Sequence, residues 1–475
     1  MFIDGEFVSA VSGATFDAIS PIDQRVLAKV ASGDSIDVDK AVAAAKRTFE
    51  NGVWRDLNPR DKKTIMLKWA DLIREHYEEI ALLETLEVGK PIGDTSGYDA
   101  LAVARVIQWY GEAIDKRYDE IAPAPTNSLA MITREPLGVI GAIVPWNYPI
   151  VIASWKIGPA LAMGNSMVLK PSEESSLAIL KIAQLGIEAG IPKGVFNVVT
   201  GLGDQAGQAL ARHMDVAKIA FTGSGPVGKK MLQYAAESNL KQVALELGGK
   251  SPQVVLDDVV DLDKAASTIA WGIYYNSGQT CNAGSRVIVH ESIKAALTAK
   301  LAEFVGNFKV GDPLDPTTQM GPVVSLKQRD RVNSYLELVG ESGEKFIFGG
   351  KKPSGNDCYF EPTLIDGVKH DSRLVQEEIF GPVIVIETFK TDAEALALAN
   401  GTNYGLAASV WSGNISRAHN FAKKLRAGTV WINTFDMSDV ITPFGGFNGS
   451  GSGRDKSLHA LDGYSALKTT WVDLS

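Results

Sequence analysis

Cysteine is scarce in this sequence. Its two cysteines, Cys281 and Cys358, lie far apart in a chain of 475 residues, with no CxxC pair and no cluster of histidines. A disulfide framework or a zinc site needs several such residues at short, regular spacings. We therefore expect no structural disulfide and no bound metal.

Long hydrophobic runs are also absent. No stretch of about 18 apolar residues, the length that crosses a membrane, occurs anywhere in the chain. The first residues, Met1 to Glu6, contain no basic segment followed by an apolar run, as a secretory signal would. These absences lead us to expect a cytoplasmic protein without a membrane partner.

Positive charge is neither abundant nor clustered. The 47 lysines and arginines are outnumbered by 56 aspartates and glutamates, which gives a net charge of -9, and the basic residues form no stripe. Nucleic-acid binding depends on such a stripe. A small-molecule partner is therefore favoured over a nucleic acid.

The residues that are present predict an α/β protein of two or three domains. Hydrophobic residues make up 45% of the chain, enough for several cores. Helical periodicity dominates residues 36–118, whereas short β-branched runs alternate with helix-length segments from residue 139 onward, the pattern of parallel sheets. The strands predicted for the first sheet are 139–144, 166–170, 195–199, 217–222 and 242–246, and those for the second are 252–256, 286–290, 383–389 and 405–411.

Two more segments with alternating apolar residues lie outside these cores. They are residues 121–134 and 466–472, and neither has an evident partner in the predicted sheets. Isolated strands are rarely stable alone, and pairing with a second subunit would cover their edges. We expect a homo-oligomer, either a dimer or a tetramer.

A glycine-rich motif lies between a strand and a helix. Gly223 to Gly228 has the spacing GxGxxG, after the apolar strand 218–222 and before a helix predicted over 229–237. Glycines at this place let a phosphate approach the backbone at a helix N-terminus. The motif indicates a dinucleotide site, although a glycine-rich structural turn has the same spacing. In the simplest dinucleotide interpretation, Glu246, 18 residues after Gly228, would bind the ribose.

Cys281 lies in a polar loop, residues 275–284, that follows a helix predicted over 261–274. Catalytic groups are often presented on such loops, whereas a lone cysteine is often a small core residue. The residues alone leave both interpretations open for Cys281. Cys358 has no such setting and is predicted to be a core residue.

Seven separated segments resemble signatures of the aldehyde dehydrogenase family, in the family's order and spacing, and the similarity extends over essentially the whole chain. They are Pro145-Trp146-Asn147-Tyr148-Pro149, Lys170-Pro171-Ser172-Glu173, Phe221-Thr222-Gly223-Ser224, Glu246-Leu247-Gly248-Gly249-Lys250-Ser251-Pro252, Gly278-Gln279-Thr280-Cys281, Glu377-Glu378-Ile379-Phe380-Gly381-Pro382-Val383 and Pro443-Phe444-Gly445-Gly446. Segments 109–116, 129–132 and 453–461 are similar to the bacterial branch of the family that oxidises aminoaldehydes such as γ-glutamyl-γ-aminobutyraldehyde.

The resemblance implies an aldehyde dehydrogenase-like α/β fold with three parts. A Rossmann-type NAD-binding domain would comprise residues 1–119 and 138–247. An α/β catalytic domain would follow over residues 248–448. A small β oligomerisation arm would be formed by residues 120–137 and 449–475.

The resemblance also implies catalytic roles. Cys281 would be the nucleophile that forms a thiohemiacetal and then a thioester, and Asn147 would donate a hydrogen bond to the developing oxyanion. Glu246 would activate the water that hydrolyses the thioester, a role that displaces its assignment to the ribose. Lys156 would relay protons, although a structural ion pair is an equal alternative.

For the cofactor, the resemblance implies NAD, with NADP less favoured. Lys170 and Glu173 would hold the adenosine ribose, although Pro171, Ser172 and Glu173 are also ordinary signals for the start of a helix. The other residues that match the family's cofactor pocket are Ile143, Val144, Pro145, Trp146, Gly203, Gly207, Phe221, Thr222, Gly223, Ser224, Val227, Leu247, Glu378 and Phe380.

The substrate implied is an aldehyde, with an ω-amino or γ-glutamylamino aldehyde favoured over aliphatic, aromatic or betaine aldehydes. The residues expected to wall its tunnel are Tyr148, Trp155, Phe435 and Phe444. Asp436 and Asp439 could attract a distal ammonium, although acidic loop residues are often merely solvated. The chain departs from the family at Asn448, where a lysine is common, and Thr280 and Asn282 flank the nucleophile at positions that vary.

Three other functions fit the residues less well. A CoA-acylating dehydrogenase usually lacks the glutamate that Glu246 supplies. A cysteine hydrolase needs a histidine base, and none of the six histidines lies in a recognisable active-site motif. A non-enzymatic relic of the fold would be expected to have lost Cys281, Glu246 or Asn147.

Overall fold

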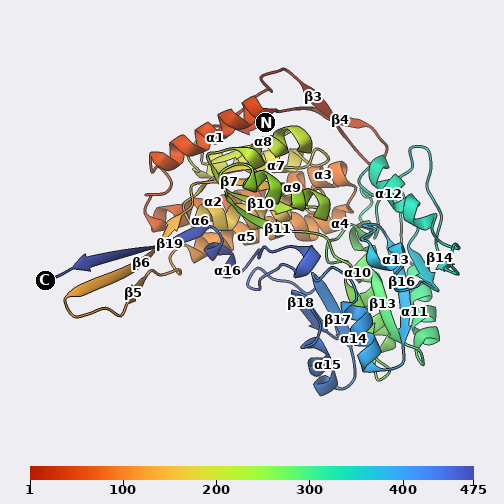
Figure 1. The fold of residues 1–475 in the computed structure, drawn as a ribbon. Helices are drawn as coiled ribbons and strands as arrows, with labels where there is room; N and C mark the ends of the chain where they lie inside the picture. The colour runs from red at the N-terminus through yellow and green to blue at the C-terminus, as the bar shows by residue number, and fades with distance from the viewer.

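The computed structural model describes residues 1–475 and contains two separate, mainly parallel sheets (Figure 1). The first has the strand order β11-β10-β7-β8-β9-β1-β2. Its parallel strands are β7 (Val139–Ile143), β8 (Ser166–Lys170), β9 (Phe196–Val198), β10 (Val216–Thr222) and β11 (Gln242–Glu246). The strands predicted for this sheet are confirmed, with small shifts at their ends.

Short antiparallel strands that the sequence did not indicate complete the N-terminal part. β1 (Phe2–Ile3) pairs with β9 and with β2 (Glu6–Phe7), and each is too short to show an alternating pattern. β3 (Thr15–Ile19) and β4 (Val26–Ala31) form a separate two-stranded sheet.

The second sheet has the order β14-β15-β16-β13-β12-β17-β18. The predicted strands are present as β12 (Pro252–Val255), β13 (Arg286–His290), β16 (Val383–Phe389) and β17 (Ala407–Trp411). β17 starts later than predicted, and the N–H of Gly405 donates to Ser450 Oγ at 3.0 Å instead of joining the ladder. The sequence analysis missed β14 (Lys345–Phe348), β15 (Thr363–Asp366) and β18 (Thr429–Ile432).

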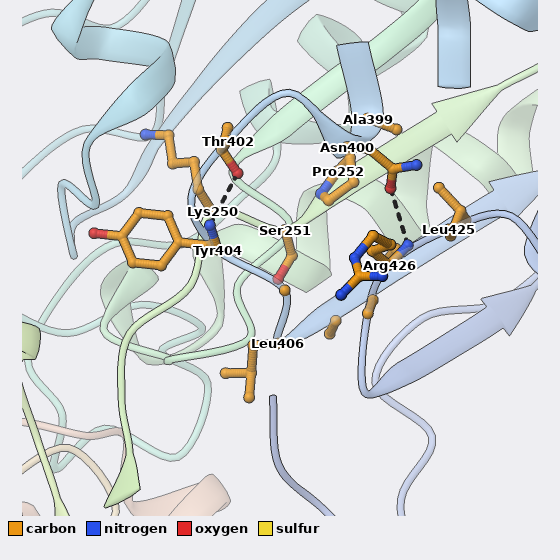
Figure 2. A pocket seen from close by; sticks show the side chains of 14 residues that line it. Lys250, Ser251, Pro252, Ala399, Asn400, Thr402, Tyr404, Leu406, Leu425 and Arg426 are labelled. Atoms are coloured by element: carbon orange, nitrogen blue, oxygen red, sulfur yellow. Dashed lines mark hydrogen bonds between the residues drawn. The ribbon is translucent and has the colours of Figure 1, made fainter. Parts of the chain in front are cut away.

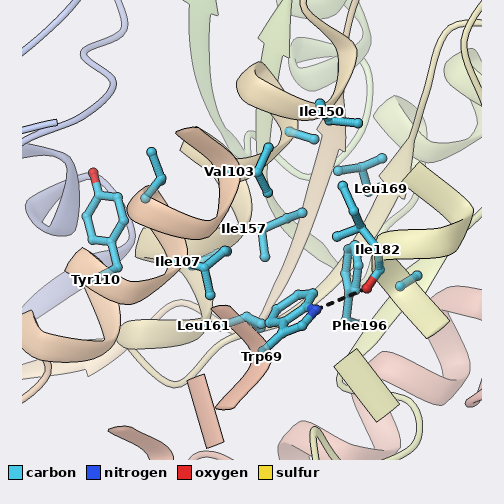
Figure 3. Packing of buried hydrophobic residues seen from close by; sticks show 14 of the residues in the cluster. Trp69, Val103, Ile107, Tyr110, Ile150, Ile157, Leu161, Leu169, Ile182 and Phe196 are labelled. Carbon is cyan, nitrogen blue, oxygen red and sulfur yellow. Dashed lines mark hydrogen bonds between the residues drawn. The ribbon is translucent and has the colours of Figure 1, made fainter. Parts of the chain in front are cut away.

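Helices cover the first sheet and bury a large apolar core, as the periodicity of residues 36–118 predicts. Trp69 is fully buried and its indole N–H donates to the carbonyl of Ile182 at 3.0 Å, among the side chains in Figure 3. The elements of this part are α1 (Ser35–Glu50), α2 (Pro59–Glu75), α3 (Tyr77–Val88), α4 (Ile92–Asp94), η1 (Thr95–Asp99), α5 (Ala100–Ala113), α6 (Pro149–Ala162), α7 (Leu177–Ala189), η2 (Gly203–Gly207), α8 (Gln208–Arg212) and α9 (Gly225–Ala236).

The remaining helices belong to the second sheet and the C-terminal segment. They are α10 (Leu262–Tyr274), η3 (Tyr275–Gly278), α11 (Lys294–Gly306), α12 (Leu326–Leu336), α13 (Arg373–Gln376), α14 (Asp392–Asn400), α15 (Ile415–Ala422), η4 (Asn448–Ser450) and α16 (His459–Asp462). None of the helices is both long enough and apolar enough to span a membrane.

The helix after the glycine-rich motif starts earlier than predicted. α9 begins at Gly225, not at Lys229, so the last four residues of the motif, Gly225 to Gly228, belong to its first turn. Pro226 explains the shift, because proline fits the first turn of a helix, where its missing N–H is not needed. Ser224 precedes the helix in an extended conformation.

The two segments predicted as strands without partners pair with each other. β19 (Ser465–Asp473) runs antiparallel to β6 (Ser128–Pro136), which also pairs with β5 (Glu120–Ala122). This three-stranded arm projects from the body of the molecule (Figure 1). Neither segment joins one of the two large sheets, as predicted, and the outer edge of β19 has no neighbouring strand.

Residues 449–464, which the sequence analysis placed in the arm, lie instead against the first sheet. The N–H of Leu247 donates to the carbonyl of Ser450 at 2.9 Å. Ala460 and Leu461 of α16 are buried in the same core as Trp69. This segment therefore contributes to the region around the end of β11.

Candidate active site

The predicted cofactor residues gather at one edge of the first sheet. β7 leads into Trp146, β8 ends at Lys170, β10 ends at Thr222 and β11 ends at Glu246. Because these strands are parallel, their carboxyl ends meet at the same edge, where open α/β sheets bind ligands. The fold therefore brings together residues that are distant in sequence.

Lys170 and Glu173 lie at the end of β8 as a loose pair. The Lys170 ammonium donates to the carbonyl of Pro171 at 2.6 Å and lies 3.9 Å from a Glu173 carboxylate oxygen. Burial lowers the pKa of Lys170 to about 8, and the charge of Glu173 opposes that shift. The Glu173 side chain is 42% exposed, so its carboxylate is free to accept from a ribose hydroxyl.

The start of α9 offers an open helix N-terminus. No side-chain hydrogen bond caps it at Ser224, and a side chain added at Gly225 would meet no atom within 4 Å. Unpaired N–H groups at such a place favour phosphate. Val227 lies in the same first turn, partly exposed, and Gly203 at the start of η2 is equally open. These features fit the pyrophosphate of a dinucleotide.

Glu378 is another residue predicted to contact the cofactor. Its carboxylate accepts from the N–H of Gly249 at 3.0 Å, and burial raises its pKa to about 7. A side chain at Gly248 would lie 2.2 Å from that carboxylate, so glycine there leaves Glu378 in its present position. Phe380 packs edge-on against Trp146 with ring centroids 5.3 Å apart.

The loop that carries Cys281 is held in a strained conformation. Asn276 and Ser277 have φ values of 48° and 55°, which non-glycine residues rarely adopt. At Gly278, with φ of 72°, a side chain would lie 2.0 Å from the carbonyl of Gly381. Backbone strain of this kind persists where the surroundings enforce it, commonly at functional sites.

Asn147 contacts this loop directly. Its buried amide donates to the carbonyl of Gln279 at 2.9 Å, and its own carbonyl accepts from Asn276 Nδ2 at 2.9 Å. A carboxamide has two N–H donors, so one is left for a ligand. The contact with Gln279 therefore leaves Asn147 able to act as the predicted donor.

Cys281 lines a cavity and has an electrostatically disfavoured thiolate. Burial raises the pKa of the thiol above its ordinary value, with further contributions from the charges of Glu378, Glu246 and Asp436, while a backbone hydrogen bond from Asn282 opposes the shift. A thiolate here needs added stabilisation before it can attack. Cys358 is fully buried in a separate apolar cluster, as predicted.

Glu246 is a buried carboxylate without hydrogen bonds. Neither of its carboxylate oxygens has a partner in the protein. A side chain at Gly445 or Gly453 would lie 2.8 Å or 2.7 Å from Oε1, so these glycines leave the carboxylate room. Burial, and then the charge of Asp455, raise the pKa of Glu246 well above its ordinary value.

Lys156 forms a buried ion pair with Asp455. This ion pair is the structural role that was the alternative to proton relay by Lys156. The pair lies close enough to Glu246 to affect the pKa of that carboxylate, which the charge of Asp455 raises and the charge of Lys156 lowers. The sequence analysis did not single out Asp455, because it lies in a segment that was assigned to the arm.

A cavity of about 220 Å³ is lined in part by Cys281. Tyr148, Trp155 and Phe444 line it as predicted, and the Tyr148 hydroxyl lies 3.1 Å from Thr280 Oγ1. Phe435 is a correction: it does not line the cavity but packs against Trp431, with ring centroids 4.7 Å apart. The reason is its position shortly after β18, where the ring packs with Trp431 and Ala407 in a small separate cluster and lies against Gly272 of α10.

The sequence analysis missed several wall residues that carry no motif. They are Tyr98, Val151, Ile152, Tyr275 and Ser438. Val151, Ile152 and Trp155 share α6 with Lys156, so the helical register after Tyr148 is the one signal that could have found the first two.

A second hollow lies beside the second sheet, and Cys281 is not among the residues that line it. Figure 2 shows Lys250 and Tyr404 on one side of it and Arg426 on the other. Its free space of about 10 Å³ would hold one water molecule at most. This hollow contains none of the predicted catalytic residues and is too small for a substrate.

The chain is similar to known proteins over nearly its whole length. The model of the aldehyde dehydrogenase family matches residues 7–470. The chain is 48% identical to the NADP/NAD-dependent aldehyde dehydrogenase PuuC of Escherichia coli strain K12, covering 100% of this chain and 95% of that protein.

Two solved structures have the same fold. Indole-3-acetaldehyde dehydrogenase in complex with NAD⁺ is 51% identical with a TM-score of 0.98, covering 100% of this chain and 96% of that one. γ-Glutamyl-γ-aminobutyraldehyde dehydrogenase from Burkholderia cenocepacia J2315 is 52% identical with a TM-score of 0.97 and the same coverage. The expected fold is confirmed.

Proposed function

The chain belongs to the aldehyde dehydrogenase family and is an NAD(P)-dependent enzyme that oxidises aldehydes, and from this premise we propose that Cys281 is its covalent nucleophile. The thiol first loses its proton to solvent in the cavity, because the thiolate is the reactive form. Its sulfur then bonds to the aldehyde carbon while the carbonyl π electrons move to oxygen. The product is a thiohemiacetal alkoxide.

Asn147 and the backbone N–H of Cys281 stabilise that alkoxide. The amide of Asn147 is buried and already fixed to the nucleophile loop, so little reorganisation is needed as charge develops. One such donor typically contributes about 2.7–4 kcal/mol to transition-state stabilisation. The alkoxide then re-forms the C=O bond, and the electron pair of the C–H bond leaves as hydride.

NAD accepts this hydride when bound, and the residues at the sheet edge fit it. Lys170 and Glu173 would hold the adenosine ribose, and the open start of α9 at Gly225 would receive the pyrophosphate. Glu378 and Phe380 would enclose the opposite end. Oxidation leaves an acyl group on Cys281 as a thioester.

Glu246 removes the acyl group. Its carboxylate accepts a proton from water as the water oxygen bonds to the thioester carbonyl carbon. The C–S electron pair returns to Cys281 as thiolate, and the carboxylic acid is released. The raised pKa of Glu246 makes it a stronger base than an exposed glutamate, provided that it is ionised.

The observation that carries this proposal is that Cys281 lines a cavity and lies in a loop to which Asn147 is hydrogen-bonded. Incubating the purified protein with NAD and a panel of aldehydes, while following NADH formation, tests it. Absence of NADH with every aldehyde would contradict the proposal.

We expect NAD to be preferred over NADP. The carboxylate of Glu173 can accept from a ribose 2′-hydroxyl but repels a 2′-phosphate. Because Glu173 is partly exposed, the repulsion should change kcat/KM by roughly tenfold. Glu173→Gln should therefore reduce the ratio of kcat/KM for NAD to that for NADP, measured at fixed aldehyde concentration. Equal values for the two cofactors in the wild-type enzyme would refute this role for Glu173.

The proposed substrate is an ω-amino or γ-glutamylamino aldehyde. Asp436 lines the cavity with Cys281 and accepts from Asn282 Nδ2 at 2.7 Å. The Asp436 side chain is exposed to solvent at the cavity, but protein atoms surround it on its other sides. This surrounding protein raises the pKa of Asp436 to about 6. Above that pH the carboxylate is ionised and attracts an ammonium group.

Asp436→Asn should lower kcat/KM for 4-aminobutyraldehyde relative to butyraldehyde. A partly exposed ion pair typically contributes up to about 1 kcal/mol, or roughly fivefold. In the wild-type enzyme the preference should weaken as pH falls through the pKa of Asp436, since protonation removes the charge. Asp371→Asn, an exposed site elsewhere, is the charge-matched control. If butyraldehyde is the better substrate of the wild-type enzyme, the aminoaldehyde assignment fails.

The arm formed by β5, β6 and β19 is proposed to be an oligomerisation element alongside an NAD-binding and a catalytic domain. The outer edge of β19 has free backbone groups, and Leu467 and Trp471 on this strand are 66% and 62% exposed. Such an edge is usually covered. Analytical ultracentrifugation at micromolar concentration should show a dimer or a tetramer, and a monomer would contradict the proposal.

A further inference from the structure

A small chamber adjoins the substrate cavity. Tyr98, Val151, Trp155 and Ser438 line both spaces. The chamber has about 20 Å³ of free space, compared with about 220 Å³ in the main cavity. This is more than one water needs but far less than a second substrate needs, so the chamber suits a small terminal group.

Lys456 lines this chamber as a buried cation without an ion pair. Its residue is 3% exposed, and its ammonium donates to Ser438 Oγ. It lies 5.3 Å from the ring centre of Trp155 and 5.6 Å from that of Phe444, both in the wall of the main cavity. An ammonium has three donors, and Ser438 uses one of them. No carboxylate forms an ion pair with it, although the negative charges of Asp436, Asp439 and Asp455 lie near enough to favour its charged form.

The backbone at Lys456 is in a strained conformation. Lys456 and Ser457 have φ values of 61° and 54°, a conformation that costs of order 1–3 kcal/mol for such residues. The N–H of Ser457 donates to the carbonyl of Val440 at 2.7 Å, and the Tyr110 hydroxyl donates to the carbonyl of Ser457 at 3.2 Å. The fold thus enforces a strained turn that points a buried ammonium at the chamber.

Arg105 on α5 supplies a second positive charge to the same chamber. It is exposed and makes no hydrogen bond or ion pair with an acidic side chain. Asp439 is the one acidic side chain in the chamber wall, and its Oδ1 accepts from the N–H of Ile441 at 3.1 Å. Two cations with free donors therefore face a space of terminal-group size.

We infer that this chamber is a carboxylate-binding subsite, in which Lys456 and Arg105 receive an acidic group at the end of the substrate distant from the aldehyde. The inference rests on the proposed function and narrows its substrate class. With Asp436 in the adjoining wall, the two charges suit a zwitterionic amino-acid end. A γ-glutamylamino aldehyde carries such an end, whereas a simple ω-amino aldehyde carries only the ammonium.

Substrates that differ only in their distal group test the subsite. We would compare ω-carboxyaldehydes of increasing length, from succinic semialdehyde upward, with unsubstituted aldehydes of the same length and with γ-glutamyl-γ-aminobutyraldehyde. In the wild-type enzyme, kcat/KM for the carboxylate should exceed that for the unsubstituted aldehyde once the chain is long enough to reach the chamber. Lys456→Met should lower that ratio by about tenfold, as expected for a lost hydrogen bond to a charged group, mainly through KM.

Arg105→Gln should lower the ratio less, because Arg105 is exposed, and Arg105→Lys should restore most of it. Lys424→Met, which removes an exposed charge far from the cavity, is the matched control and should leave the ratio unchanged. The subsite is refuted if no carboxylate is favoured at any length, or if Lys456→Met leaves the ratio as in wild type. In either case, NADH formation with unsubstituted aldehydes still tests the proposed function independently of the subsite. Loss of NADH formation with every aldehyde in the wild-type enzyme would instead overturn that function.

Discussion

Cys281→Ala is expected to abolish aldehyde oxidation while leaving NAD affinity within a few-fold of wild type. The thiol supplies the covalent bond to the substrate carbon, and no other side chain in the cavity is a comparable nucleophile. Glu378 and the start of α9, which fit the cofactor, are on other elements. Steady-state NADH formation and fluorescence titration with NAD measure the two effects separately.

The chain offers a matched control in its other cysteine. Cys358 is fully buried in a cluster with Phe360 and Val323, so Cys358→Ala should cost some stability but little activity. A covalent label specific for thiols should modify wild type and Cys358→Ala at the active site, but not Cys281→Ala. Substantial turnover by Cys281→Ala would exclude covalent catalysis through this residue.

The fold could be predicted wherever a pattern was long enough to be periodic. The five parallel strands of the first sheet, from Val139–Ile143 to Gln242–Glu246, are short apolar-rich runs that alternate with helices, and all five were predicted. β1 and β2, with two residues each, and β15 at Thr363–Asp366 were missed. Short strands like these are formed by tertiary pairing, which leaves no local period in the sequence.

Most residues of the candidate site were predicted from the seven matched segments, and the errors concern residues outside those segments. Cys281, Tyr148 and Phe444 are in matched segments, and the structure brings them to one cavity. Phe435 lies in a loop whose side-chain direction depends on its packing against Trp431. Asp455 became visible as a neighbour of Glu246 only through the ion pair with Lys156, a contact between positions 299 residues apart.

Glu246→Gln is expected to slow the release of the acyl group far more than its formation. Glutamine keeps the size of the side chain but cannot accept a proton from water. The first turnover should therefore give a rapid burst of about one NADH per active site, followed by slow steady-state turnover. Rapid mixing of enzyme and NAD with aldehyde measures the burst, and mass spectrometry of the quenched enzyme should show the acyl group on Cys281.

The pH dependence separates a base from a merely structural carboxylate. Burial and the charge of Asp455 raise the pKa of Glu246. Because Glu246 can act as a base only when it is ionised, turnover limited by hydrolysis in the wild-type enzyme should rise as the pH increases through that raised pKa. Glu246→Gln should lose this rise, whereas Glu237→Gln, at an exposed carboxylate after α9, should retain it. If the burst disappears together with steady-state turnover, Glu246 acts before the thioester forms, and its assignment to water activation alone is wrong.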